Sequence, residues 1–160
     1  MDTPATTFDV SACTFETIAS DQSPQTSLQQ HSAVRRRGRV LVLEDDPLQL
    51  KLVQQHLHSV GFEVVTATSI EEARQRLCES GLQLAILDVQ LPDGCGFELC
   101  EEIDSNAAYA GMPVVVLSSL TEAGAVRRTR ASGGRYFLCK PYDPNVLLAI
   151  IERALEDPID

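Results

Sequence analysis

The chain has 160 residues, of which 44% are hydrophobic, and its 13 Lys and Arg against 23 Asp and Glu give a formal net charge of −10. A chain of this length can form one domain with a hydrophobic core and have a further segment outside it. The negative charge argues against direct binding of nucleic acid. The sequence contains no apolar run of about eighteen residues and no basic-then-apolar N-terminus, so we expect no membrane insertion and a cytoplasmic location.

The first part of the chain differs in composition from the rest. Up to about Val34 it is rich in Ser, Thr, Gln, Asp and Ala, contains no Lys or Arg, and has neither a strand period nor a helix period. A short basic run at residues 35–39 then precedes apolar clusters that recur to the C-terminus. We predict a disordered tail over residues 1–38, a globular domain over residues 39–157 and a short C-terminal end over residues 158–160.

Within the globular part, short apolar runs rich in β-branched residues alternate with helical patterns. Pro47 opens the first helix, Ser69 and Glu72 form a capping box for the second, and Asp143 and Pro144 open the fifth. The runs predicted as strands are residues 40–43, 63–67, 84–87, 114–117 and 136–139. Apolar strands alternating with helices are typical of an α/β fold, so we predict an open, doubly wound parallel sheet of five strands with five helices.

Polar side chains follow four of these strands at their carboxyl ends, where open parallel sheets bind ligands. Carboxylates that converge there repel one another, so the cluster needs a cation or raised pKa values, and a hard divalent ion such as Mg²⁺ prefers such oxygen ligands. A lysine at the same edge can neutralise a carboxylate or hold a phosphate. Each residue alone could be an ordinary cap or turn, but their joint occurrence indicates a site. The residues are Glu44, Asp45 and Asp46 after the first strand, Asp88 after the third, Ser118 and Ser119 after the fourth, and Lys140 after the fifth.

In this order, the residues resemble those of the receiver domain of two-component response regulators. The acidic pair of that family falls on Glu44 and Asp45, its phosphoacceptor on Asp88, its hydroxyl residue on Ser118 and its lysine on Lys140. The family pattern D-x-x-x-P-x-x-x-G is matched by Asp88, Pro92 and Gly96, and the glycine ahead of the fifth strand by Gly133. The resemblance covers residues 39 to about 157 and implies a flavodoxin-like, CheY-like fold with strand order 2-1-3-4-5.

The resemblance also implies a reaction and a metal. A sensor histidine kinase or a histidine phosphotransfer protein would pass a phosphoryl group to Asp88. Mg²⁺, or Mn²⁺ in its place, would be held by Asp45, Asp88 and the backbone carbonyl of Gln90, and by Glu44 through water. Because three acids follow the first strand, Asp46 is an alternative ligand if the register differs by one residue.

The phosphoryl group and the output surface follow from the same resemblance. Lys140 and Ser118 would take part in the transfer, and the backbone N–H groups of Val89 and Ser119 would contact the phosphoryl group. Ser118 and Phe137, the latter at a position where tyrosine is usual, would then switch the surface of the fourth helix, fifth strand and fifth helix for a downstream protein target. The chain would act as a monomer or a phosphorylation-dependent dimer. It would be a phosphoacceptor with self-catalysed phosphotransfer and autodephosphorylation, not an enzyme in any further sense.

Two other functions are open to such a sequence. A pseudo-receiver would bind partners without phosphorylation, although such modules usually lose the acidic pair, the acceptor or the lysine. A phosphatase of the haloacid-dehalogenase type needs a second Asp two residues after its nucleophile, and this chain has Gln90 there. Since only residues 156–160 follow Leu155, we expect a stand-alone receiver whose output passes through another protein.

Overall fold

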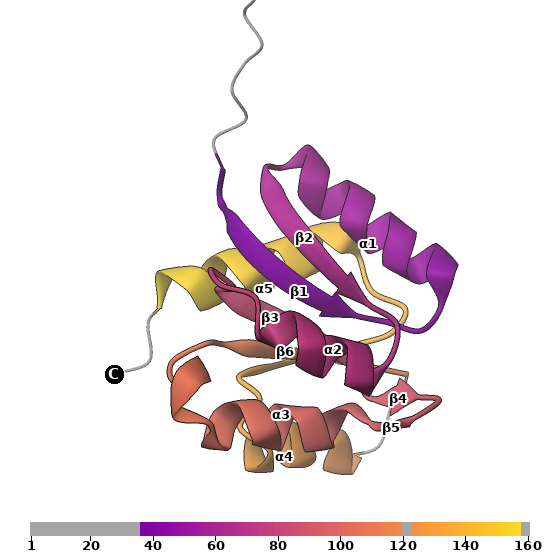
Figure 1. The fold of residues 1–160 in the computed structure, drawn as a ribbon. Coiled ribbons are helices and arrows are strands. Elements are labelled where there is room, and N and C mark those ends of the chain that lie inside the picture. Colours follow the sequence, from indigo (N-terminus) through magenta and orange to yellow (C-terminus); the bar gives the residue numbers. More distant parts are fainter. Residues whose placement is uncertain (1–35, 120–122, 158–160) are drawn as a thin grey trace, which may run out of the picture. The chain divides into compact units, whose positions relative to one another are not determined.

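The computed structural model describes residues 36–119 and 123–157, which form a parallel sheet flanked by helices (Figure 1). Its neighbouring strands are all parallel and lie in the order β2-β1-β3-β6-β7. Since β4 and β5 form a separate hairpin, this is the predicted order 2-1-3-4-5, and the fold class is confirmed. The five strands are β1 (Gly38–Leu43), β2 (Phe62–Ala67), β3 (Leu84–Asp88), β6 (Val114–Ser118) and β7 (Tyr136–Cys139).

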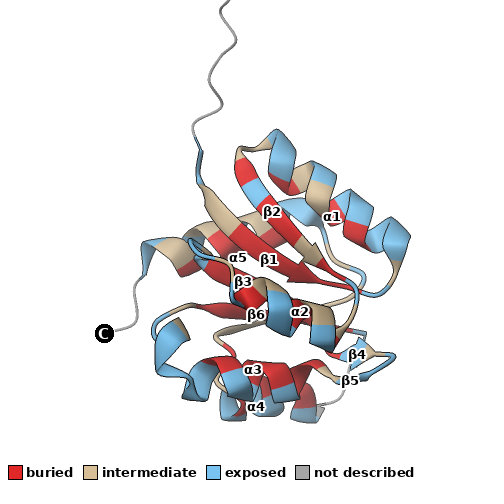
Figure 2. Ribbon diagram, viewed as in Figure 1, coloured by how far each residue is buried: buried red, intermediate tan, exposed pale blue. Residues whose placement is uncertain are grey.

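Helices cover both faces of the sheet, because each strand sends alternate apolar side chains to opposite sides. One face packs against α1 (Pro47–Ser59) and α5 (Pro144–Glu156), through Leu57 and Ile151 among others. The other face packs against α2 (Ile70–Leu77) and α3 (Gly96–Ser105). The next helix, α4 (Ala123–Ala131), contacts β7. The strands in the middle of the sheet are accordingly the most buried of the described elements (Figure 2).

The predicted helix starts are largely confirmed. Asp46 caps α1 and Asp143 caps α5, each followed by proline at the first helical position. At α2 the Glu72 amide donates to Ser69 Oγ at 3.2 Å, as the capping box requires. The reciprocal contact differs, because the Glu72 carboxylate accepts from the Thr68 amide at 2.8 Å instead of from the Ser69 amide.

The first strand begins within the basic run at residues 35–39. β1 begins at Gly38, two residues before the predicted strand. The Arg37 amide donates to Gly61 O at 3.0 Å, and its guanidinium lies 5.2 Å from the centre of the Phe62 ring and pairs with Glu152. The basic run therefore includes residues that join the fold, while residues 1–35 of the predicted tail and the C-terminal end at 158–160 lie outside the described residues.

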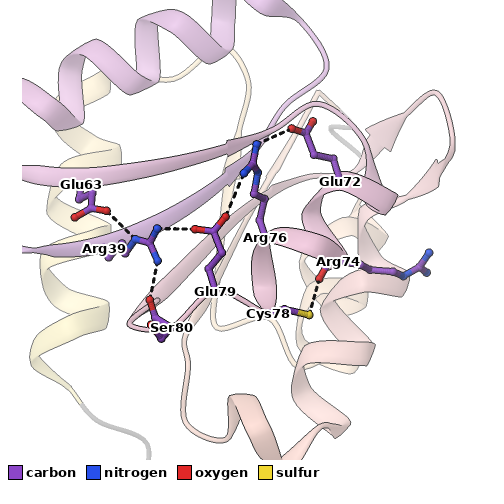
Figure 3. A network of polar contacts seen from close by, with 8 residues as sticks. All are labelled: Arg39, Glu63, Glu72, Arg74, Arg76, Cys78, Glu79 and Ser80. Carbon is purple, nitrogen blue, oxygen red and sulfur yellow. Dashed lines mark hydrogen bonds and ion pairs between the residues drawn. The ribbon is translucent and has the colours of Figure 1, made fainter.

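A chain of ion pairs connects α2 to the two neighbouring strands (Figure 3). Arg39 on β1 bonds to Glu63 on β2 at 2.8 Å and to Glu79, just beyond α2, at 2.6 Å. Arg76 continues the chain to Glu79 at 3.2 Å and to Glu72 at 3.3 Å. Because water screens such exposed pairs, they orient α2 more than they stabilise the fold.

Two short elements were not predicted. One is the hairpin of β4 (Gln90–Leu91) and β5 (Gly94–Cys95), which lies between Asp88 and α3. The other is the 3-10 helix η2 (Ala107–Tyr109). In the part of the chain that the structure describes, no helix has both the length and the apolar character to cross a membrane.

Candidate functional site

The polar residues at the carboxyl ends of four strands come together as the sequence predicts. Glu44 directly follows β1, Asp88 ends β3, Ser118 ends β6, and Lys140 directly follows β7. Backbone hydrogen bonds hold the two residues that lie just past their strands: the Glu44 amide donates to Ala67 O at 3.1 Å, and the Lys140 amide to Ser118 O at 2.8 Å. Glu44, Asp88 and Ser118 are buried.

Lys140 joins two of these acids directly. Its Nζ donates to Glu44 Oε2 at 2.5 Å and to Asp88 Oδ2 at 2.7 Å. Burial by itself would lower the pKa of Lys140, but the hydrogen bonds and charges of Asp88 and Glu44 outweigh burial and raise this pKa. For Glu44, a carboxyl group, burial has the opposite sign: it raises the pKa, against the hydrogen bond and the charge of Lys140, which lower it. The ammonium is therefore a firmly charged group between two carboxylates.

The three predicted acidic residues can share one cation. Glu44, Asp45 and Asp88 each offer a carboxylate oxygen, and these oxygens lie within 4.8 Å of one another. Three carboxylates and one ammonium leave a formal charge of −3 + 1 = −2 on the cluster, which favours a divalent ion. Hard oxygen donors are the ligands that Mg²⁺ and Mn²⁺ prefer, so the residues present fit such an ion.

Asp46, the alternative ligand, is committed to α1. Its Oδ1 accepts from the Leu48 amide at 2.8 Å and from the Gln49 amide at 3.0 Å. These backbone hydrogen bonds, that of Gln49 first, lower the pKa of Asp46. The structure thus places Asp46 as a helix cap and leaves Glu44 and Asp45 as the acids nearest Asp88.

Substitutions of Asp46 distinguish a cap from a metal ligand. Asparagine caps helices about as well as aspartate, so we expect Asp46→Asn to keep both stability and Mg²⁺ affinity. We expect Asp46→Ala to lower the urea midpoint of unfolding by roughly 0.5 M, because the first turn of α1 loses its acceptor. The measurements are urea unfolding and calorimetric Mg²⁺ titration. Weaker Mg²⁺ binding by Asp46→Asn would show that the carboxylate is a ligand after all.

One predicted backbone contact has a competing partner in the structure. The Val89 amide, predicted to contact the phosphoryl group, donates to Leu117 O at 3.1 Å in the hydrogen-bond ladder between β3 and β6. The amide that lies at Asp88, the predicted phosphoacceptor, is that of Gln90, which donates to Asp88 Oδ1 at 3.2 Å. Successive backbone amides of a strand point to opposite neighbouring strands. Once the register of β3 with β6 is known, the sequence therefore predicts which of the two amides enters the ladder.

The remaining predicted residues lie along β6 and β7. Ser118 is fully buried, and Ser119 is exposed beside it. Phe137 is half-buried on the neighbouring strand β7, opposite Val116, and packs at the margin of the core beneath α2 and α3. Ser118 and Phe137 therefore lie on adjacent strands. Ser118 pairs with Cys139 at the end of the sheet that borders the acidic cluster, and Phe137 lies two residues before Cys139.

A groove of about 590 Å³ opens beside Lys140. Val53 and His56 of α1 line one part of it, and Tyr142 and Leu147 line another. Ser119 also borders the groove, so the site is accessible from the side of α1.

Comparisons of the sequence with known proteins agree with this geometry. A family model for the response regulator receiver domain matches residues 40–152. The transcriptional regulatory protein GltR of Pseudomonas aeruginosa is 37% identical over 119 residues, which make up 74% of this chain and 49% of GltR. The transcriptional regulatory protein CrdR of Helicobacter pylori is 32% identical, over 76% of this chain and 57% of CrdR. The chain thus spans about half the length of these relatives.

Solved structures give the same result. The BeF3-activated receiver domain of DrrB from Thermotoga maritima has a TM-score of 0.67 and 30% identity, covering 75% of this chain and 98% of the DrrB domain. The chemotaxis response regulator CheY4 of Vibrio cholerae has a TM-score of 0.69 and 28% identity, covering 74% of this chain and 98% of CheY4.

Proposed function

The chain belongs to the response regulator receiver family of two-component systems, and on this premise we propose that it accepts a phosphoryl group on Asp88 from a sensor histidine kinase or a histidine phosphotransfer protein. One observation carries the proposal: the Lys140 ammonium lies between the buried carboxylates of Glu44 and Asp88, with Asp45 at the exposed side. A site with an acceptor, a cation and a metal-binding pair has the parts that phosphoryl transfer to a carboxylate needs.

In the proposed transfer, a carboxylate oxygen of Asp88 attacks the phosphorus of a phosphohistidine, and the phosphorus–nitrogen bond breaks as the phosphorus–oxygen bond forms. The Lys140 ammonium orients the acceptor from one side, and the Gln90 amide does so from the other. When bound by Asp45, Asp88 and the Gln90 carbonyl, and by Glu44 through water, Mg²⁺ or Mn²⁺ would neutralise the charge on the phosphoryl oxygens. Slow hydrolysis of the acyl phosphate would then return the chain to its starting state.

The metal requirement gives a direct test. We expect phosphoryl uptake from acetyl phosphate, followed by intact mass, to need Mg²⁺ and to cease when a chelator removes it. Asp45→Asn should weaken Mg²⁺ binding at least about tenfold, because one of three carboxylate ligands loses its charge. Asp46→Asn, one residue along, is the matched control and should bind Mg²⁺ like the wild type. Full uptake in the presence of the chelator would contradict a metal-dependent mechanism.

The output of the proposed switch is the surface of α4, β7 and α5. All four residues of β7 are half-buried, and β7 is an edge strand that pairs with β6 alone. On α4, Arg127 and Arg130 are exposed, and neither has a carboxylate partner among the described residues. These features support a docking surface for a downstream protein, with Ser118 and Phe137 connecting it to Asp88.

A further inference from the structure

The hairpin that follows the phosphoacceptor is anchored to α2. Asp93 stands at its tip, between β4 and β5, and both of its carboxylate oxygens accept backbone hydrogen bonds. Oδ1 accepts from the Ile70 amide at 3.1 Å and Oδ2 from the Glu71 amide at 3.2 Å. These amides belong to the first turn of α2 and have no acceptor within the helix. The two contacts, that with Ile70 first, lower the pKa of Asp93.

The packing at this contact leaves little room for the tip to move. At Gly94, next to Asp93, a Cβ atom would lie 2.9 Å from Ile70 Cδ1. The Ile70 side chain is itself buried in the core, and Leu91 on the other strand of the hairpin packs against the same cluster. The hairpin therefore packs closely against the first turn of α2.

The other end of the hairpin lies at the phosphoacceptor. The Gln90 amide donates to Asp88 Oδ1 at 3.2 Å, and the Gly96 amide donates to Val89 O at 2.9 Å. Only two residue pairs, Gln90 with Cys95 and Leu91 with Gly94, make up the hairpin ladder. A ladder this short does not fix its own position in water, so the position depends on what the hairpin contacts.

We propose that Asp93 is a positioning residue for the metal site. By holding the hairpin tip on α2, Asp93 fixes the backbone of Gln90, three residues earlier, and with it the Gln90 carbonyl and amide. The inference rests on the proposed function, because it takes the Gln90 carbonyl to be a ligand of Mg²⁺. It adds a residue outside the acidic cluster, one whose side chain faces α2 instead of the ion.

Asp93→Ala tests this role. We expect it to weaken Mg²⁺ binding about tenfold, as loss of a residue that orients a ligand typically does. We expect Asp93→Asn, which keeps one carbonyl oxygen, to lie between the wild type and Asp93→Ala. The measurements are calorimetric Mg²⁺ titration and amide hydrogen exchange without Mg²⁺, in which the Gln90 amide should exchange faster in Asp93→Ala.

Ser69→Ala is the matched control, because the Ser69 hydroxyl caps the same helix by accepting from the Glu72 amide, a bond that lies within α2 and its cap. It should weaken the start of α2 but leave Mg²⁺ affinity within about twofold of the wild type. If Asp93→Ala binds Mg²⁺ like the wild type, or if Ser69→Ala weakens binding equally, Asp93 serves only as a helix cap and the inference fails. If the wild type itself binds no Mg²⁺, the proposed function fails, and the positioning role fails with it.

Discussion

Asp88→Asn removes the proposed phosphoacceptor and should abolish phosphoryl uptake. Incubated with acetyl phosphate and Mg²⁺, the wild-type protein should gain the mass of one phosphoryl group, while the variant should gain none. The amide keeps an oxygen for Lys140 or Gln90 to bond, so the fold should persist. The amide oxygen lacks the negative charge that makes a carboxylate a nucleophile toward phosphorus. Intact-mass spectrometry measures both proteins side by side.

The control for this experiment is Asp46→Asn, an equal chemical change in a residue that caps α1. It should take up one phosphoryl group, like the wild type. Phosphoryl uptake by Asp88→Asn at the wild-type rate would show that another carboxylate is the acceptor. No uptake by the wild type under any condition would favour a receiver-like module that binds its partners without phosphorylation.

Gly96→Ala should destabilise the protein by about 3 kcal/mol, measured as the free energy of urea unfolding. A Cβ atom at Gly96 would lie 1.9 Å from the Asp88 carbonyl oxygen and 3.1 Å from Val89 Cα. These neighbours are backbone atoms in a buried part of the chain, so they cannot move aside as the end of a side chain can. Because the displaced carbonyl belongs to the phosphoacceptor, phosphoryl uptake should fall as well.

Gly124→Ala is the matched control, because Gly124 lies in α4 and a Cβ atom there would meet nothing within 4 Å among the residues that the structure describes. It should raise stability by up to about 1 kcal/mol, since alanine favours a helix over glycine. If the free energy of unfolding of Gly96→Ala lies within about 0.5 kcal/mol of the wild-type value, the backbone beside Asp88 relaxes and this close approach is not essential.

The strands could be predicted because parallel strands buried on both faces are continuous apolar runs. Residues 136–139 agree with β7 at both ends, and the other four strands differ from prediction by one or two residues. The hairpin at residues 90–95 was missed for a physical reason. Two-residue strands are too short to show a period, and the Pro-Asp-Gly sequence, which ends on the first residue of β5, indicates only a turn.

The members of the acidic cluster could also be predicted, because strand ends at one edge of a parallel sheet converge. Their division of labour could not. Three acids follow β1, and although the predicted helix start at Pro47 places Asp46 next to α1, only its hydrogen bonds with the Leu48 and Gln49 amides decide that Asp46 is the cap. Likewise, the pairing of β3 with β6 decides that the Val89 amide enters the ladder and the Gln90 amide faces Asp88. The contact of Asp93 with α2 joins residues more than twenty positions apart, and no local pattern signals it.

The Lys140 side chain connects an edge strand of the sheet to its central strands. Lys140 follows the edge strand β7, yet its ammonium passes over the end of β6 to bond at β3 and β1. The far edge of the sheet is thus joined to Asp88 through a single side chain, beside the proposed connection through Ser118 and Phe137. Phosphorylation of Asp88 would change the hydrogen bond with Lys140 directly, and that change would act on the residue that follows β7.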